Sequence, residues 1–231
     1  KLIETIQEYE NIFKKNKIDR YEIVATSAFR DTTNSEDARR YVETAINHPL
    51  KIISGLEEAQ LMRFHPKSNT GKKKIFVDLG GGSTEFFSRD DPGVEIRSFQ
   101  LGAVRNMLKK DKKAEWVRME EWLKTMRPRK KVIGIGGNIR SFLQAFNAKE
   151  MDSKNFSKKV KELSGMTTQE KILRFQFSPD RADVIDNAMS IFQFIVTHLD
   201  AKTITATKWG VSDSIGVKLF HEIYSNKINI L

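Results

Sequence analysis

The sequence predicts an α/β fold with two domains, each built on a mixed sheet, and a cleft between them. Two observations lead to this prediction. From residue 74 onward, three short strand-like segments precede an alternation of helical and strand-like segments. Before residue 67, the chain repeats the later part of that order without the three opening strands. We therefore place the first domain in residues 1–66 and the second in residues 67–231.

The second domain is expected to open with an antiparallel meander, because tight turns join its first three strands. Periodicity places its strands at Lys74–Leu79, Thr84–Ser88, Val94–Phe99, Val132–Ile135 and Thr203–Thr207. It places helices within Ala103–Lys124, from about Asn138 to Ala148, in further segments before residue 203, and near Ser212–Tyr224. This order, βββαβαβα, is the ribonuclease-H-like plan, in which a hairpin turn and two later strand ends converge on one site.

The first domain is expected to contain only the later part of the same plan. Its predicted elements are the helices Leu2–Lys15, Asp37–Asn47 and Leu56–Phe64 and the strands Tyr21–Thr26 and Leu50–Ile53. Parallel strands normally lie inside a sheet, and a parallel pair without neighbouring strands would have its edge exposed. We therefore expect the native protein to begin before Lys1. Two such domains in tandem are typical of the superfamily of actin-like ATPases, sugar kinases and phosphatases, and this step is an analogy between folds.

The composition excludes several classes of function. With 39% hydrophobic residues and no cysteine, the chain can bury a core but has no disulfide, thiolate metal site or cysteine nucleophile. No apolar run approaches the ~20 residues of a membrane-spanning helix, so we expect no membrane insertion and a cytoplasmic location. The net charge of +10 should attract polyanions, although short basic runs are usually solvated. Scattered tryptophans disfavour sequence-specific binding of nucleic acid.

The strongest chemical signal is the loop DLGGGSTE, which runs from Asp78 to Glu85 between two predicted strands. Glycine allows positive φ and close backbone approach, so the loop's N–H groups and hydroxyls can cradle phosphate oxygens. The residues expected to bind phosphate here are Gly80, Gly81, Gly82, Ser83 and Thr84. A carboxylate at each end of such a loop suits Mg²⁺. The alternative is an ordinary hairpin, in which Asp78 bonds the turn amides and Glu85 is solvated.

This loop resembles the second phosphate loop of the exopolyphosphatase and guanosine pentaphosphate phosphohydrolase family. Further family segments stand in order on both sides, at residues 25–31 (ATSAFRD), 53–59 (ISGLEEA), 102–105 (GAVR) and 134–140 (GIGGNIR). The resemblance covers nearly the whole chain. It implies a Mg²⁺-dependent hydrolase of the stringent response, which removes terminal phosphate from polyphosphate or the 5′-terminal phosphate from guanosine pentaphosphate. The choice between these substrates stays open.

The two glutamates of ISGLEEA are expected to have different roles. Ser54 followed three residues later by Glu57 is a capping box, in which Glu57 bonds back to the helix start. Neighbouring residues on a helix point about 100° apart, which leaves Glu58 able to face the cleft. Glu58 also matches the family's catalytic glutamate, which implies a base that positions or deprotonates the attacking water. The alternative is a surface glutamate favoured by the helix dipole alone.

Other candidate phosphate contacts are weaker. Arg30 follows a predicted strand, where its guanidinium can bind phosphate through two parallel hydrogen bonds, and the resemblance implies that it does. A solvated loop arginine is the alternative. Arg105 is a lesser candidate of the same kind. Gly136 and Gly137 resemble a phosphate-facing loop of the superfamily, although turns from strand to helix often contain glycine.

Three classes of function stay open at this point. The first is the phosphate-releasing hydrolase, acting on polyphosphate or a guanosine polyphosphate, with a homodimer as a possible assembly. The second is an ATPase or kinase of the same fold, which would need an adenosine pocket in the second domain. The third is a non-catalytic binder of the same polyanions, against which the retention of Glu58, Asp78 and Glu85 argues. The histidines show no metal-binding spacing, and no serine nucleophile motif is present.

Overall fold

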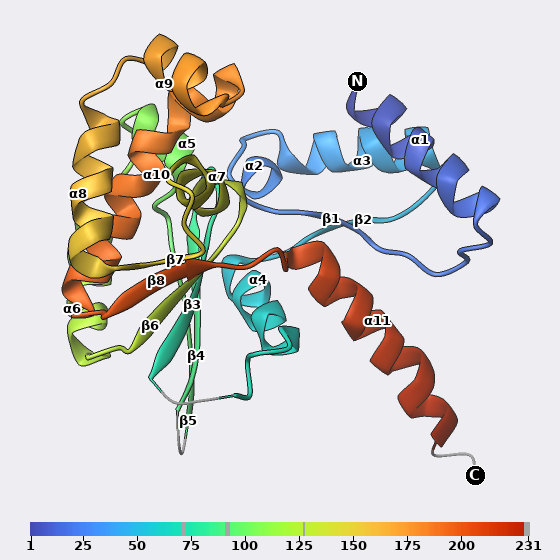
Figure 1. Cartoon of the computed structure of the whole chain (residues 1–231). Helices are drawn as coiled ribbons and strands as arrows, with labels where there is room; N and C mark the ends of the chain where they lie inside the picture. The colour runs from blue at the N-terminus through green and yellow to red at the C-terminus, as the bar shows by residue number, and fades with distance from the viewer. Residues whose placement is uncertain (71–72, 91–92, 127, 229–231) are drawn as a thin grey trace.

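The computed structural model describes residues 1–70, 73–90, 93–126 and 128–228, with side chains as far as residue 224. Within these residues the strands form two sheets, one of six strands and one of two (Figure 1). Helices accompany both sheets. The mixed α/β fold predicted from the sequence is confirmed.

The larger sheet has the strand order β5-β4-β3-β6-β8-β7. Its strands are β3 (Lys74–Leu79), β4 (Thr84–Asp90), β5 (Gly93–Phe99), β6 (Lys131–Ile135), β7 (Glu150–Asp152) and β8 (Thr203–Ala206). The predicted antiparallel meander is formed by β3, β4 and β5, and β6 and β8 extend the sheet in parallel from β3. The short edge strand β7 was not predicted, because two of its three residues are acidic and show no apolar alternation.

The helices follow most of the predicted positions. They are α1 (Leu2–Lys15), α2 (Ser27–Arg30), α3 (Ser35–Ile46), α4 (Gly55–Leu61) with the 3₁₀ turn η1 (Met62–Phe64), α5 (Ala103–Met107), α6 (Lys113–Thr125), α7 (Gly137–Ala145), α8 (Ser153–Ser164), α9 (Thr168–Phe175), α10 (Pro179–His198) and α11 (Val211–Ile228). The helical region predicted after residue 103 divides into α5 and α6. The four-residue helix α2 was not predicted, because it is too short to show a period.

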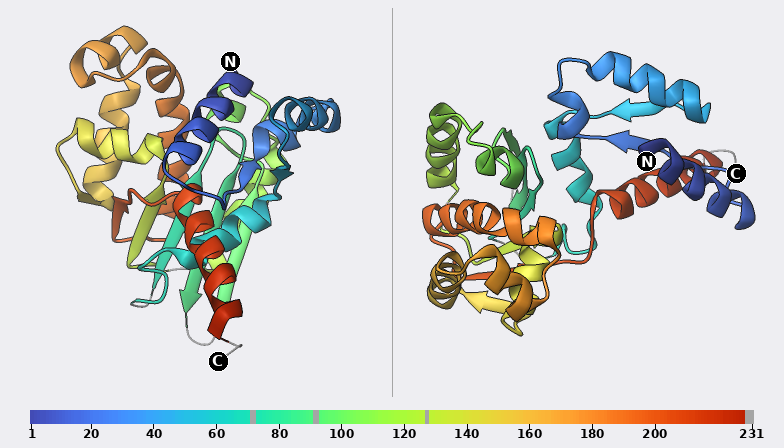
Figure 2. Two further views of the ribbon diagram at one scale, coloured as in Figure 1. Left: turned by 90° about the vertical axis from the view of Figure 1, so that its right-hand side faces the viewer. Right: turned by 90° about the horizontal axis from the view of Figure 1, so that it is seen from above.

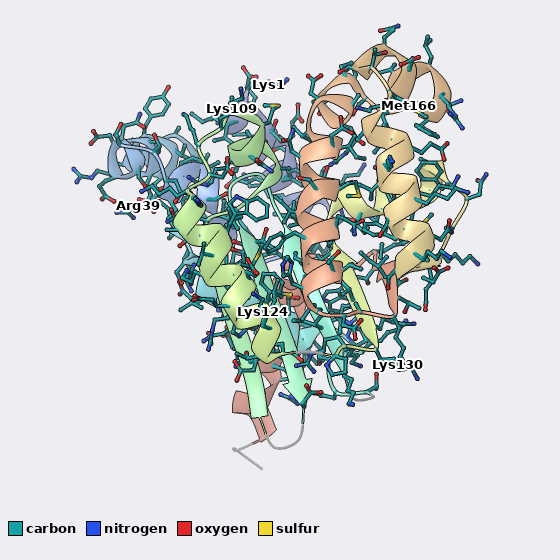
Figure 3. The ribbon with its side chains drawn as sticks, turned by 90° about the vertical axis from the view of Figure 1, so that its left-hand side faces the viewer. Lys1, Arg39, Lys109, Lys124, Lys130 and Met166 are labelled. Atoms are coloured by element: carbon teal, nitrogen blue, oxygen red, sulfur yellow. The ribbon has the colours of Figure 1, made fainter. Side chains whose placement is uncertain are left out.

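Alternate side chains of β3 enter two different cores, as the two faces of a strand require. Ile75 and Val77 pack with Phe192 of α10 in the main core, under the face where α6, α10 and α8 lie side by side (Figure 3). Phe76 points to the opposite face and packs with Ala59 of α4 and with Met62. Helix α4 is thereby held against the sheet that carries the glycine loop.

The smaller sheet consists of the parallel strands β1 (Ile23–Ala25) and β2 (Leu50–Ile52). Its small core contains Ala25, Val42, Ile46 and Leu50. Helices α1 and α3 pack against each other beside it. These elements occupy the positions predicted for the first domain.

The chain passes twice between the two sheets. The first passage is α4, which follows β2 but packs on β4 and β5. The second is α11, which follows β8 but packs on η1 and α4 (Figure 2). It places Lys218 Nζ 3.2 Å from Glu22 Oε1. The predicted domain boundary between residues 66 and 67 stays a prediction, and contacts cross it at both passages.

Candidate active site

The glycine loop turns between β3 and β4, where the Gly80 N–H donates to the Ser83 carbonyl over 3.0 Å. A Cβ on Gly102 would lie 2.6 Å from the backbone of Gly81 and Gly82, so only glycine permits this close approach. Within the described residues, the N–H groups of Gly81, Gly82 and Ser83 donate to no protein acceptor. They are available to the oxygens of a ligand.

Carboxylates from three elements stand around this loop: Asp78 at the end of β3, Glu85 at the start of β4, and Glu58 on α4. Asp78 and Glu85 are cross-strand neighbours, and Glu85 accepts a hydrogen bond from Ser98 Oγ over 2.8 Å. Burial raises the pKa of Asp78 to about 6, against the opposing effect of Arg140. Burial first, and then the neighbouring carboxylates, also raise the pKa values of Glu58 and Glu85.

These carboxylates present chemistry that suits a cation. The Oε2 atom of Glu58 is buried and has no hydrogen-bond partner in the described part of the chain. Mg²⁺ takes one or two protein carboxylates, keeps several waters and binds substrate oxygens. The described residues do not gather three acidic or imidazole side chains into a ready-made metal site. Asp78 and Glu85 therefore fit Mg²⁺ as a partial ligand set that waters and substrate would complete.

Arg30 joins the first part of the chain to the glycine loop. It ends α2, and its Nη1 donates to the Ile53 carbonyl over 2.8 Å while its Nη2 donates to Ser83 Oγ over 3.3 Å. The same Nη1 lies 4.0 Å from Glu58 Oε2. The guanidinium thus sits between the predicted base and the predicted phosphate loop.

The start of α7 lies beside Asp78. Gly136 precedes the helix with a φ of +99°, which strongly favours glycine, and a Cβ there would lie 3.7 Å from Asp78 Oδ1. A side chain at Gly137 would collide with the guanidinium of Arg181. The positive end of this helix therefore faces the carboxylate region, where an anion would also be favoured.

Sequence comparison agrees with this geometry. The model of the Ppx/GppA phosphatase family matches residues 1–222. The chain belongs to this family. A Ppx/GppA family member from Aquifex aeolicus superposes with a TM-score of 0.76 and 23% identity, over 96% of this chain and 80% of that one. An exopolyphosphatase from Cytophaga hutchinsonii gives 0.77 and 17%, over 97% and 81% of the two chains.

A third solved structure, of an exopolyphosphatase-like protein, has a TM-score of 0.77 and 20% identity, covering 94% of this chain and 82% of its own. At such identities the structural likeness shows the fold alone. Family membership implies a phosphohydrolase acting on phosphate polymers or nucleotides. In the part of this Ppx/GppA chain that the structure describes, no helix combines the length and apolar character needed to cross a bilayer.

The structure brings the predicted site residues into one region, but the side chain of one of them points away from it. The others are Arg30, Glu58, Asp78, Gly80, Gly81, Gly82, Ser83, Glu85, Gly136 and Gly137. Thr84 is fully buried, and its Oγ1 donates to the Leu101 carbonyl over 2.6 Å. Its hydroxyl stabilises the turn from the core side, which corrects the expectation that it adds a donor to the phosphate cradle.

The predicted capping box at the start of α4 is confirmed. The Ser54 N–H donates to Glu57 Oε2 over 2.7 Å, and the Glu57 N–H donates to Ser54 Oγ over 3.2 Å. Hydrogen bonds from the Ser54 backbone N–H and from the Ser54 side chain to the carboxylate lower the pKa of Glu57. Adjacent residues of one helix thus have opposite electrostatic surroundings, since the Glu58 side chain is only 12% exposed and burial raises its pKa.

Some residues of the region were missed or undervalued from the sequence. Ser98 lies opposite Glu85 in the meander, so the register of the hairpin would have found it. Arg140 lies one turn into α7, and its positive charge acts to lower the pKa of Asp78. Asp31 pairs with Arg105 across 74 residues, a contact for which no local sequence signal exists.

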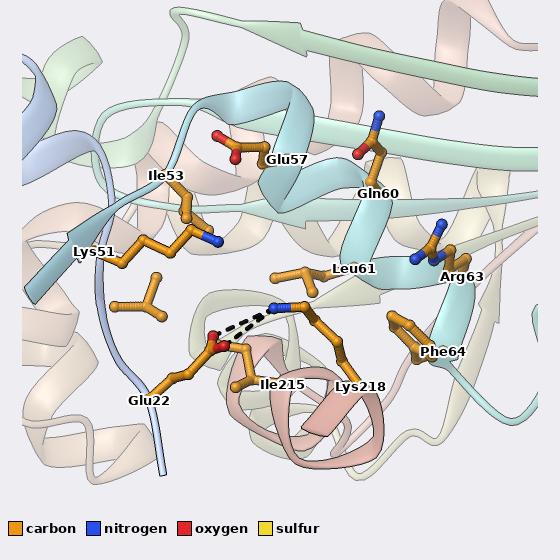
Figure 4. Close-up of a pocket in the computed structure, with 11 residues that line it drawn as sticks. Glu22, Lys51, Ile53, Glu57, Gln60, Leu61, Arg63, Phe64, Ile215 and Lys218 are labelled. Atoms are coloured by element: carbon orange, nitrogen blue, oxygen red, sulfur yellow. Dashed lines mark hydrogen bonds and ion pairs between the residues drawn. The ribbon is translucent and has the colours of Figure 1, made fainter. Parts of the chain in front are cut away.

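A separate cavity of about 140 Å³ lies among β1, β2, α4, η1 and α11 (Figure 4). It is lined on one side by Glu57, and two of its charged groups, Lys218 and Glu22, pair with each other. None of the predicted site residues lines it. This cavity is therefore no part of the candidate active site.

Proposed function

We propose that this chain is a hydrolase that releases terminal phosphate from polyphosphate or the 5′-terminal phosphate from guanosine pentaphosphate. The observation that carries the proposal is the buried Oε2 atom of Glu58, which lacks a hydrogen-bond partner among the described residues and lies 4.0 Å from Arg30. A water molecule between this oxygen and a terminal phosphate would satisfy it. The raised pKa of Glu58 suits a group that accepts a proton near neutral pH.

In this mechanism the N–H groups of Gly81, Gly82 and Ser83 and the guanidinium of Arg30 hold the terminal phosphate. The water oxygen forms a bond to the terminal phosphorus while the bond from that phosphorus to the bridging oxygen breaks. The proton of the water passes to Glu58, and the shortened chain leaves with the bridging oxygen. The donors that surround the phosphate neutralise the charge of the transition state.

Asp78 and Glu85 would hold Mg²⁺ when it is bound. The ion would supply further neutralisation of phosphate oxygens and of the leaving oxygen. Without Mg²⁺, the carboxylates of Asp78 and Glu85 would repel the anionic substrate. We therefore expect activity to depend on Mg²⁺.

A second cavity, of about 330 Å³, supports guanosine pentaphosphate as a substrate. It adjoins the start of α7 through Arg181, which contacts Gly137. Gln144 and Phe175 are among the residues that line it, and they offer an amide and an aromatic ring to a nucleobase. A polyphosphate chain has no group that needs such a surface. We expect Gln144→Ala to raise KM for guanosine pentaphosphate several-fold and to leave KM for polyphosphate unchanged.

The deciding experiment measures phosphate release by the full-length protein from long-chain polyphosphate, guanosine pentaphosphate and ATP, each with Mg²⁺ and with a chelator. The proposal requires Mg²⁺-dependent release from at least one of the first two, well above release from ATP. Faster turnover of ATP would favour the ATPase alternative. Tight binding of the polyanions without any release would favour the non-catalytic alternative.

A further inference from the structure

The start of α5 binds three successive carbonyl groups of the glycine loop. The Ala103 N–H donates to the Gly80 carbonyl over 3.0 Å. The N–H groups of Val104 and Arg105 both donate to the Gly81 carbonyl over 2.9 Å. The following carbonyl, of Gly82, accepts a hydrogen bond from Arg105 Nε over 2.7 Å.

This arrangement sets the direction of the loop's N–H groups. In a planar trans peptide unit, the carbonyl of one residue and the N–H of the next point in opposite directions. Because the three carbonyls point toward α5, the N–H groups of Gly81, Gly82 and Ser83 point away from it. These are the three N–H groups that donate to no acceptor within the described residues. Three aligned donors form a concave site for an anion.

Arg105 holds the last of these peptide units from its side chain. Its Nε donates a hydrogen bond to the Gly82 carbonyl, and its Nη2 pairs with Asp31, the residue that follows α2. The guanidinium is therefore already occupied by the loop and by Asp31. If this peptide unit turned over, it would present a carbonyl oxygen to the phosphate in place of an N–H, and the two would repel.

We propose that the segment Gly102–Arg105 is the template that holds the loop in its anion-binding conformation, and that Arg105 is a positioning residue. It acts through the Gly82 peptide and does not touch the substrate. The inference rests on the proposed function, because it assumes that the loop binds the phosphate that is released. The absence of room for a Cβ at Gly102 is a second sign that the template and the loop must fit closely.

Two substitutions of Arg105 separate this role from a direct contact. Arg105→Gln keeps an N–H donor at the position of Nε, because both nitrogens follow Cδ, but it removes the positive charge. Arg105→Met has similar length and no donor. The positioning role predicts that the Met variant loses affinity for inorganic phosphate, measured calorimetrically with Mg²⁺, by roughly 10- to 100-fold, the size expected when one N–H donor to the charged ligand turns away. The Gln variant keeps the donor to the Gly82 carbonyl and should stay within about fivefold of the wild type, the cost of a somewhat weaker hydrogen bond.

Equal losses in the Gln and Met variants would show that the positive charge of Arg105, and not its Nε donor, determines phosphate affinity and would overturn the inference, as would unchanged affinity in both. Thermal unfolding monitors folding, and Gly102→Ala gives a second test in which Arg105 is intact but the loop is displaced. The same loss of phosphate affinity is expected for it, and wild-type affinity would contradict the template. If phosphate affinity follows the predicted order among the wild type and these variants but the wild type hydrolyses no substrate, the proposed function fails while the inference stands.

Discussion

Glu57 and Glu58 are adjacent in the sequence, yet their carboxylates meet opposite surroundings. The role of Glu57 was predictable because the capping box is a local pattern, complete within residues 54–57. The raised pKa of Glu58 could not be read from the local sequence, since it depends on burial and on the charges of Asp78 and Arg30 from other segments. Residue-scale chemistry at this site is therefore set by which side of α4 a carboxylate occupies.

Replacing Asp78 by Asn keeps the size of the side chain and removes one buried negative charge. We expect Asp78→Asn to raise the Mg²⁺ concentration for half-maximal phosphate release roughly 10- to 100-fold, because an amide is a poorer ligand than a carboxylate. The matched control is Asp183→Asn on the exposed surface of α10, which should change nothing. Wild-type Mg²⁺ dependence in Asp78→Asn, or full activity of the wild type in a chelator, would remove the metal role.

At the scale of elements, the sequence predicts the helices and strands that are long enough to show a hydrophobic period. The meander, β6 and α1 were all visible as patterns of apolar residues. Two short elements, α2 and β7, were invisible for lack of length. Arg30 was consequently expected in a loop, whereas it ends a helix that directs it to Ser83.

Gly55 sets how closely α4 approaches the hairpin. A Cβ at this position would collide with Ser98 Oγ and lie 3.0 Å from Glu85 Oε1. Alanine favours helices over glycine by about 1 kcal/mol, yet we expect Gly55→Ala to destabilise the protein by about 1–3 kcal/mol and to lower kcat. Chemical unfolding and initial rates measure both effects.

Adding Ser98→Gly to Gly55→Ala removes the atoms that the new methyl group meets. We expect this second change to recover much of the lost stability, because the loss comes from the clash with Ser98 and not from the helix propensity of alanine. A single variant Gly55→Ala that is as stable and as active as the wild type would show that α4 has room to move.

Across the whole molecule, the contacts that define the site join segments far apart in the chain. His65, at the end of the first passage, bonds Thr207 at the start of the second through Nε2 and Oγ1, 3.0 Å apart and 142 residues apart in sequence. The pair Asp31 and Arg105 is similar in kind. No periodicity or local motif encodes such contacts, so the sequence indicated the parts of the site and the folded chain shows how they meet.

His65 makes a pH-dependent contribution to stability. Burial, with smaller effects of Lys67 and Lys74, lowers its pKa, and its Nδ1 accepts the Lys67 N–H over 3.0 Å. A histidine with a lowered folded-state pKa stabilises the fold above its ordinary pKa of 6.5 and loses that contribution as the pH falls below it. We expect urea unfolding at about pH 8 to show His65→Gln less stable than the wild type, and the difference to shrink at about pH 5.5. A difference independent of pH would contradict the assignment.

The net charge of +10 concerns the molecule as a whole and its encounter with polyanions. If polyphosphate is the substrate, KM should fall as the chain lengthens, because each added phosphate meets further lysine or arginine. The fall should shrink at high salt, which screens these contacts. Measuring KM against chain length at two salt concentrations tests this. A KM independent of length would favour guanosine pentaphosphate.

The most direct test of the central claim compares Glu58→Gln with Glu57→Gln in phosphate release at saturating substrate and Mg²⁺. The account predicts that Glu58→Gln lowers kcat by roughly 10²- to 10⁴-fold with little change in KM, because it removes the acceptor of the water proton. Glu57→Gln should keep kcat within a few-fold and lose roughly 0.3–1 kcal/mol of stability with the negative charge at the helix start, since glutamine can still accept the Ser54 N–H. Equal losses of kcat in the two variants, or wild-type turnover in Glu58→Gln, would contradict the assignment of Glu58 as the base.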